Sequence, residues 1–247
     1  MTEISQETAA PRAVWGLWAT LGWFVLALVS SQIIGSVVLI LLRPDALAAG
    51  MDALVKDGVV VALSNIPANV VQVIILALAS RRPGWSFTEY LGLVRPASRD
   101  AVAALWILVM LLLGYDALTY ALGRDIVTPF QVDTYRSAQS AGMLPLFWFA
   151  LVIAAPVAEE IMFRGFLFRG WVTSERMAIP AILIISALFA AIHIQYDWFG
   201  ILQVFFIGLL LGIVRWRTGS TTLTILMHVL ANLWATVETM IKVEWLS

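Results

Sequence analysis

Two adjacent carboxylates and an arginine stand inside an otherwise apolar stretch, AEEIMFRGFLFRG, which runs from Ala158 to Gly170. An ionisable side chain within a bilayer costs about 2.5–3.5 kcal/mol to insert, so each one predicts a function. On a helix, Glu160 and Arg164 share one face with the acid on the N-terminal side, which favours an ion pair. Glu159 points about 100° away from Glu160. We therefore predict a paired, supporting Glu160 and a Glu159 that faces other groups.

The chain contains two histidines, His193 and His228, and both fall inside predicted membrane-spanning helices. Asn232 follows His228 by one helical turn, so an imidazole and an amide project from one face, and Phe189 is expected to wall the His193 ring. At 1.5 Å per residue, Glu159 lies about 16 Å from the cytoplasmic end of its helix and His193 about 22 Å. His228 and Asn232 lie at about 13 and 20 Å. Three helices are thus expected to bring these groups to one depth.

A carboxylate, two imidazoles and an amide at one depth suit the hydrolysis of an amide bond by an activated water. The carboxylate can take a proton from a water that one imidazole orients, while the other imidazole and the amide donate to the developing oxyanion. Glu159, His193 and His228 also resemble a two-histidine, one-carboxylate zinc site with an open position. The histidines lack HExxH spacing, and no partner that orients either ring is evident, which argues against a metal. Both classes stay open: a glutamate-type enzyme without a cofactor, or a zinc metalloprotease.

The composition predicts an all-α, polytopic transmembrane helical bundle of about seven to eight helices. The 247 residues are 61% hydrophobic and 13% charged, against roughly 45–50% and about 25% in an ordinary soluble domain. Several apolar runs near 20 residues predict one transmembrane domain over residues 1–247. A net charge of −1 offers no basic face to neutralise phosphates, so no nucleic-acid partner is expected. The absence of cysteine excludes disulfides and thiolate chemistry.

Seven predicted spans account for most of the chain. Their ranges are 15–42, 59–79, 101–122, 144–170, 179–194, 199–214 and 222–241. Seven crossings place the N-terminus and the basic loops at Arg81–Arg99, 169–176 and 215–217 on one side, which the positive-inside rule makes cytoplasmic. We expect a multi-pass protein of the plasma (inner) membrane, in contact with membrane lipid. No pair of halves with matched broken helices is visible, which argues against a secondary transporter.

Other polar residues inside the spans are predicted to bond neighbouring helices. Asn65, Asn69 and Gln72 interrupt the second span, and contact with substrate is the alternative for them. Asp116 lies near the outer end of the third span and is expected to snorkel or to pair with a polar neighbour. Gly208 and Gly212 form a GxxxG pair that lets two helices approach closely.

Three motifs follow one another on successive predicted helices. EEIMFR fits EExxxR, FAAIH fits FxxxH and HVLAN fits HxxxN. In this order they resemble the CPBP family of intramembrane endopeptidases, which includes the CAAX prenyl endopeptidases and bacteriocin self-immunity proteins. The resemblance covers about residues 144–239, which we expect to form the protease core.

The resemblance implies a role for each polar residue of the motifs. Glu159 and His193 would activate the water, His228 and Asn232 would stabilise the oxyanion, and the ion pair predicted above would support them. The substrate would be a membrane-embedded or lipidated peptide. Enzymes of this family are described both as glutamate-type and as metalloproteases, so zinc held by the carboxylate and the two imidazoles stays open. The alternative is a non-catalytic membrane protein of the same fold that binds a partner or toxin. The oligomeric state does not follow from the sequence.

Overall fold

The computed structural model of the protein describes residues 12–48 and 50–246. Its regular structure is helical, and the described residues contain no strand, which confirms the all-α class. In chain order the helices are α1 (Leu17–Leu42), α2 (Pro44–Ala48), α3 (Met51–Lys56), α4 (Gly58–Ala79), α5 (Phe87–Leu91), α6 (Ser98–Ala121), α7 (Pro129–Ser140), α8 (Leu144–Trp148), η1 (Phe149–Ala154), α9 (Ala155–Glu160), η2 (Ile161–Leu167), α10 (Phe168–Trp171), α11 (Glu175–Ala191), α12 (Trp198–Thr218) and α13 (Thr221–Trp245).

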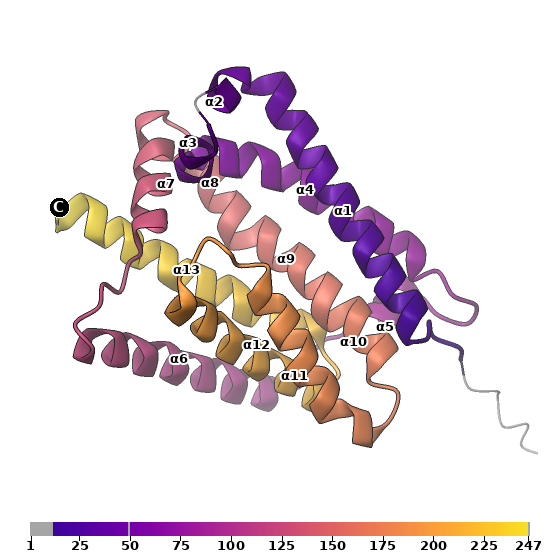
Figure 1. The fold of residues 1–247 in the computed structure, drawn as a ribbon. Coiled ribbons are helices and arrows are strands. Elements are labelled where there is room, and N and C mark those ends of the chain that lie inside the picture. Colours follow the sequence, from indigo (N-terminus) through magenta and orange to yellow (C-terminus); the bar gives the residue numbers. More distant parts are fainter. Residues whose placement is uncertain (1–11, 49, 247) are drawn as a thin grey trace, which may run out of the picture.

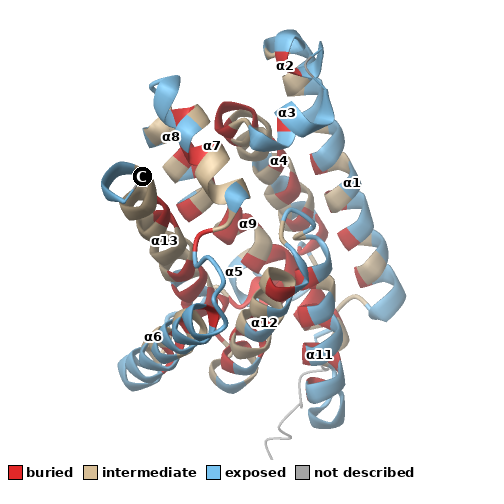
Figure 2. Cartoon of the chain, turned by 60° about the vertical axis from the view of Figure 1, so that its left-hand side comes forward, coloured by how far each residue is buried: buried red, intermediate tan, exposed pale blue. Residues whose placement is uncertain are grey.

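A single helical rod, Leu144–Trp171, runs through the middle of the bundle and joins α8, η1, α9, η2 and α10 end to end. Figure 1 shows it between α1 and α4 on one side and α6 and α11 to α13 on the other. In its most apolar window 56% of the residues are buried inside the molecule, compared with 17% for α1 and α6, whose outer faces are exposed (Figure 2). The EEIMFR motif is therefore surrounded by protein, where charged groups can find partners.

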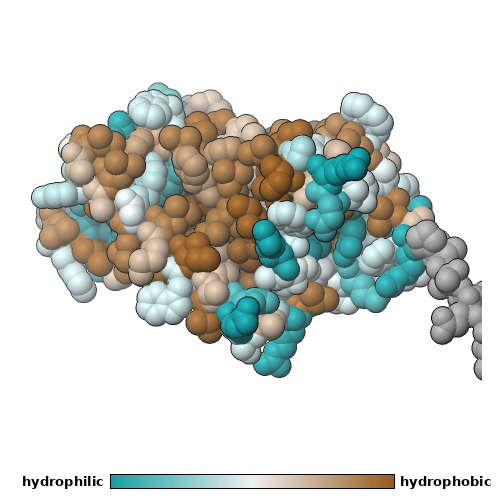
Figure 3. Space-filling model, turned by 90° about the horizontal axis from the view of Figure 1, so that it is seen from below, coloured by the Kyte–Doolittle hydropathy of each residue, from teal (hydrophilic) through white to brown (hydrophobic). Residues whose placement is uncertain are grey.

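Six helices among the described residues are long and apolar enough to cross a membrane. The predicted fifth span, α11, is shorter than these six helices. It has 17 residues and is about 26 Å long at 1.5 Å per residue. It still carries the chain across the bundle, since Arg124 after α6 pairs with Asp197 after α11 at the far end. The chain is an integral membrane protein whose surface carries an apolar middle region (Figure 3), and the seventh crossing stays a prediction.

The basic loops meet the start of the described chain at one end of the bundle, which we call the basic end. Arg12 pairs with the Glu89 carboxylate at 3.3 Å, and Arg169 Nη2 donates to Glu89 O at 2.8 Å. Ser220 Oγ donates to Val94 O at 2.6 Å. The three predicted loops thus lie together, and the assignment of this end to the cytoplasm stays a prediction.

Four helices, α2, α3, α5 and α7, lie between the predicted spans, and two of them begin with a capping box. Ser86 begins α5 with a reciprocal capping box to Glu89, and Thr128 begins α7 with the same arrangement to Gln131. Both pairs are visible in the sequence as a hydroxyl followed three residues later by Glu or Gln, and Pro129 adds a favoured first helical residue. Both segments are short and α7 is polar overall, so neither fits a membrane span, which is why they were not recognised.

Helices α11 and α12 pack closely at the predicted glycine pair. A Cβ atom on Gly212 would come 2.8 Å from Ile182 Cγ2, and one on Gly208 would come 3.2 Å from Ser186 Cβ. Packing is therefore the role of both glycines, as the GxxxG spacing indicates. The close approach also exposes the Gly208 carbonyl to the central rod.

Candidate active site

Two π-helical segments flank the α9 turn that carries Glu159. In such a segment the N–H of one residue bonds the carbonyl five residues back, and Ala155 N–H donates to Ala150 O in this way. Leu151 O would next accept from residue 156, but Pro156 has no N–H. Asn232 Nδ2 donates to Leu151 O at 2.8 Å instead. Because Pro156 offers no N–H, Leu151 O stays free of a backbone donor, and its bond from Asn232 ties α13 to the central rod.

The tie predicts a measurable coupling between Asn232 and Pro156. Asn232→Ala leaves Leu151 O without a donor and is expected to lower the free energy of unfolding by about 1 kcal/mol. Adding Pro156→Ala supplies a backbone N–H to this carbonyl, so the double variant should recover part of the loss. Thermal unfolding of the purified variants in one detergent measures both effects. An equal loss with and without Pro156→Ala would show that the two residues do not share this carbonyl.

Glu160 is the centre of a buried polar cluster. Its Oε1 accepts from Arg164 Nη1 at 2.8 Å and lies 3.0 Å from His228 Nδ1. The side chains of Glu160 and Arg164 are fully buried, and that of His228 is 5% exposed. The ion pair is the one that helical spacing predicts. The contact with His228 was not predicted, because it joins two helices rather than two turns of one.

Arg164 is held by more than its carboxylate partner. Its Nη2 donates to Gly208 O at 3.0 Å, and its guanidinium carbon lies 4.4 Å from the centroid of the Phe189 ring. A Cβ on Gly208 would stand 3.3 Å from Nη2, so glycine permits this approach. The cation therefore has a fixed place among α9, α11 and α12.

His228 lies between the two neighbouring carboxylates. Its Nε2 lies 3.9 Å from Glu159 Oε2, and the Glu159 side chain is 21% exposed. Glu159 Oε2 has no hydrogen-bond partner among the described residues, and the Glu159 residue lines an internal cavity. Glu160 is thus paired and buried, whereas Glu159 faces open space, which agrees with the prediction from their directions on the helix.

The position predicted for His193, inside a span, was wrong. Helix α11 ends at Ala191, and His193 N donates to Ala190 O at 3.0 Å in the following turn. Asp197 then accepts from Gly200 N at 3.0 Å and starts α12. This cap fixes a tight turn that ends the helix earlier than the apolar residues around His193 indicate.

The His193 ring is oriented by its own turn of chain. Its Nδ1 lies 2.8 Å from Phe189 O, and because a carbonyl only accepts, Nδ1 carries the proton and Nε2 is left available. Phe189 walls the ring as expected, at a centroid distance of 4.9 Å. Tyr196 stacks on the other side at 6.3 Å and was not recognised from the sequence. Burial raises the pKa of the Tyr196 hydroxyl, and the charge of Glu159 adds to the rise.

The four residues predicted as catalytic line one cavity of about 590 Å³. They come from α9, from the turn after α11 and from α13, and they are Glu159, His193, His228 and Asn232. One N–H of the Asn232 amide is used at Leu151 O, which leaves its second N–H. The predicted convergence of these groups is therefore present as a shared cavity wall, while their roles are not tested by the geometry alone.

The polar residues of the other spans differ in what they contact. Gln72 Nε2 donates to Ala158 O at 3.0 Å and so ties α4 to the rod beside Glu159. Asn65, which we also expected to bond a neighbouring helix, donates to Val61 O of its own helix at 2.8 Å. Asp116 accepts from Trp234 Nε1 at 3.1 Å, the polar neighbour that its position predicts.

The residues considered as zinc ligands do not form a ready donor set. No three carboxylate, imidazole or thiol side chains converge on one point within the described part of the chain. The sequence argument that no partner orients the histidines was wrong, since Phe189 O holds His193 and Glu160 holds His228. The objection to a metal that rested on unoriented rings is therefore removed.

One family model matches part of the chain. Residues 141–234 match the model described as type II CAAX prenyl endopeptidase, Rce1-like. The matched segment contains all three motifs and extends from the start of the central rod into α13. Neither a curated protein nor a solved structure matches the chain.

Proposed function

We propose that the protein is an intramembrane endopeptidase, because residues 141–234 match the family model described as type II CAAX prenyl endopeptidase, Rce1-like. It cleaves a peptide bond of a membrane-embedded or lipidated substrate by means of an activated water. The observation that carries the proposal is that Glu159, unlike Glu160, lines the cavity, and that its Oε2 has no donor and lies 3.9 Å from His228 Nε2. A buried carboxylate oxygen without a protein donor is suited to bind and deprotonate a water.

Glu159 acts as the general base. As the water oxygen attacks the scissile carbonyl carbon, one of its protons moves to the Glu159 carboxylate. His193 Nε2, left free by the bond from Nδ1 to Phe189 O, accepts a hydrogen bond from the same water and orients it. The C–N bond then breaks, and the proton held by Glu159 passes to the leaving amine.

His228 and Asn232 stabilise the oxyanion that forms on the scissile carbonyl. Because the Glu160 carboxylate accepts from His228 Nδ1–H, Nε2 donates only when the ring is protonated. The second N–H of Asn232 is the other donor. Arg164 balances the charge of Glu160 and holds Glu160 Oε1 in an ion pair. Glu160 therefore does not compete with Glu159 for the water.

We infer a glutamate-type reaction, supported by the absence of a convergent three-ligand set among the described residues. Metal analysis of the purified protein, alongside a cleavage assay with and without a chelator, tests it. Metal-free protein is expected to keep its cleavage rate. Loss of cleavage on chelation, restored by added zinc, would instead assign Glu159, His193 and His228 as ligands.

A further inference from the structure

The cavity that contains Glu159 extends from the middle of the bundle toward the end away from the basic loops. Helices α4 and α12 begin at the far end and line the cavity with residues 61–72 and 200–207. Helices α6 and α13 end there and line it with residues 112–119 and 228–239. None of the cavity-lining residues comes from a basic loop. The catalytic groups therefore form the floor of a cavity that extends toward the far end.

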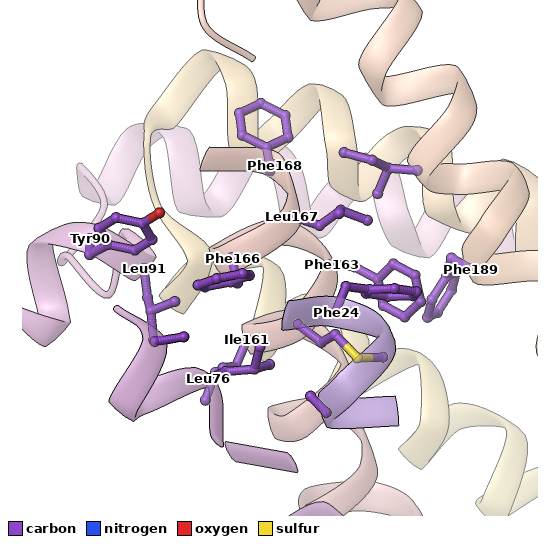
Figure 4. Packing of buried hydrophobic residues seen from close by; sticks show 14 of the residues in the cluster. Phe24, Leu76, Tyr90, Leu91, Ile161, Phe163, Phe166, Leu167, Phe168 and Phe189 are labelled. Carbon is purple, nitrogen blue, oxygen red and sulfur yellow. The ribbon is translucent and has the colours of Figure 1, made fainter. Parts of the chain in front are cut away.

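Close-packed aromatic and aliphatic side chains fill the space on the other side of the site. Phe163, Phe166 and Leu167 of η2 are fully buried, as are Tyr90 and Leu91 of α5. Figure 4 shows these side chains packed against one another around the rod. Protein interiors packed in this way leave no space for a continuous row of water molecules or for a peptide.

The α5 segment is also fastened to the bundle, so the basic end is closed rather than merely narrow. Thr221 Oγ1 donates to Leu91 O at 2.6 Å, and Arg169 Nε donates to Tyr90 O at 2.9 Å. Thr221 N donates to Gly92 O at 2.7 Å. Three backbone carbonyls in a row are thus held by α10 and α13.

The cavity wall is polar enough to hold water. Asp116 and Glu238 line it from two helices, and both accept from Trp234 Nε1, at 3.1 and 2.9 Å. Gln131 and Gln203 add amides. Ionisable side chains inside membrane spans face protein or a water-filled cavity, so this wall indicates an aqueous route to Glu159.

We propose that the substrate reaches Glu159 from the end opposite the basic loops. Because the positive-inside rule makes the basic end cytoplasmic, the cleavage site is presented from the extracytoplasmic side. The substrate class is then a membrane-associated peptide whose scissile bond is exposed on the outer face, not the tail of a cytoplasmic protein. The use of the cavity as a substrate route rests on the proposed function, whereas its sidedness does not depend on catalysis.

The chain contains no cysteine, so single cysteines report on access without a background. Gln203→Cys and Ala235→Cys each place a thiol on the cavity wall, and Ala97→Cys places one on an exposed basic loop. Leu202→Cys is the matched control, because Leu202 neighbours Gln203 but is 40% exposed on the outside of the bundle. A charged, membrane-impermeant maleimide is applied to intact cells and to inside-out vesicles.

Both cavity thiols are expected to label in intact cells, Ala97→Cys only in inside-out vesicles, and Leu202→Cys in neither. Labelling of the cavity and loop thiols from the same side overturns the inference, as does failure of both cavity thiols to label from either side.

Labelled Gln203→Cys should lose peptide cleavage, while labelled Ala97→Cys keeps it. Undiminished cleavage with a bulky label at Gln203→Cys excludes this cavity as the route. Absence of cleavage in every variant would count against the proposed function and leave the sidedness to the labelling pattern.

Discussion

Glu159→Gln is expected to lower kcat for peptide cleavage by about 10²- to 10⁴-fold, the range typical of a lost general base. The amide keeps the size and hydrogen-bonding capacity of the carboxylate but cannot accept a proton from water. Because Glu159 is partly exposed to the cavity and makes no ion pair closer than 3.9 Å, the thermal stability of the variant should change little. Single-turnover cleavage of a membrane peptide, measured with saturating enzyme, isolates this step.

Glu175→Gln is the matched control, because Glu175 is an exposed carboxylate at the start of α11. It should leave cleavage unchanged. Retained cleavage in Glu159→Gln would remove Glu159 as the base. If a binding or immunity phenotype survives in Glu159→Gln while cleavage is lost, the non-catalytic function on the same fold gains support.

Much of the fold could be predicted because the bilayer restricts the chain to a few arrangements. Apolar runs near 20 residues give the spans, and the basic loops place their ends on one side. The Glu160–Arg164 pair is local, since both residues lie on one helix face. These predictions need no knowledge of which helix packs against which.

The details of the site could not be predicted because they depend on packing between helices. The bond between Glu160 and His228 joins residues 68 positions apart, and helical spacing carries no information about such pairs. The π segments change the direction of side chains along the rod, yet apolar composition does not distinguish them from α-helix. His193 was placed inside a helix because hydropathy continues past Ala191, where α11 ends, while Asp197 starts the next helix.

Arg164→Met is expected to lower the free energy of unfolding by about 3–5 kcal/mol, the cost of leaving a buried charge without its partner. Glu160 Oε1 would lose its bond from Arg164 Nη1, and Gly208 O would lose its bond from Nη2. Arg169→Met is the control on the same rod. Arg169 donates to backbone carbonyls rather than to a buried carboxylate, so its removal should cost less. Thermal unfolding in one detergent compares the two.

The double variant Glu160→Gln, Arg164→Met separates support of the fold from support of His228. Removing the carboxylate charge together with the guanidinium leaves no uncompensated ion, so stability should recover part of the loss seen in Arg164→Met. Cleavage should not recover with it, because position 160 no longer offers a carboxylate that holds His228 Nδ1. Losses of stability that simply add would show that the two residues act independently. Recovery of stability and cleavage together would confine the pair to a structural role and remove its contribution to the oxyanion site.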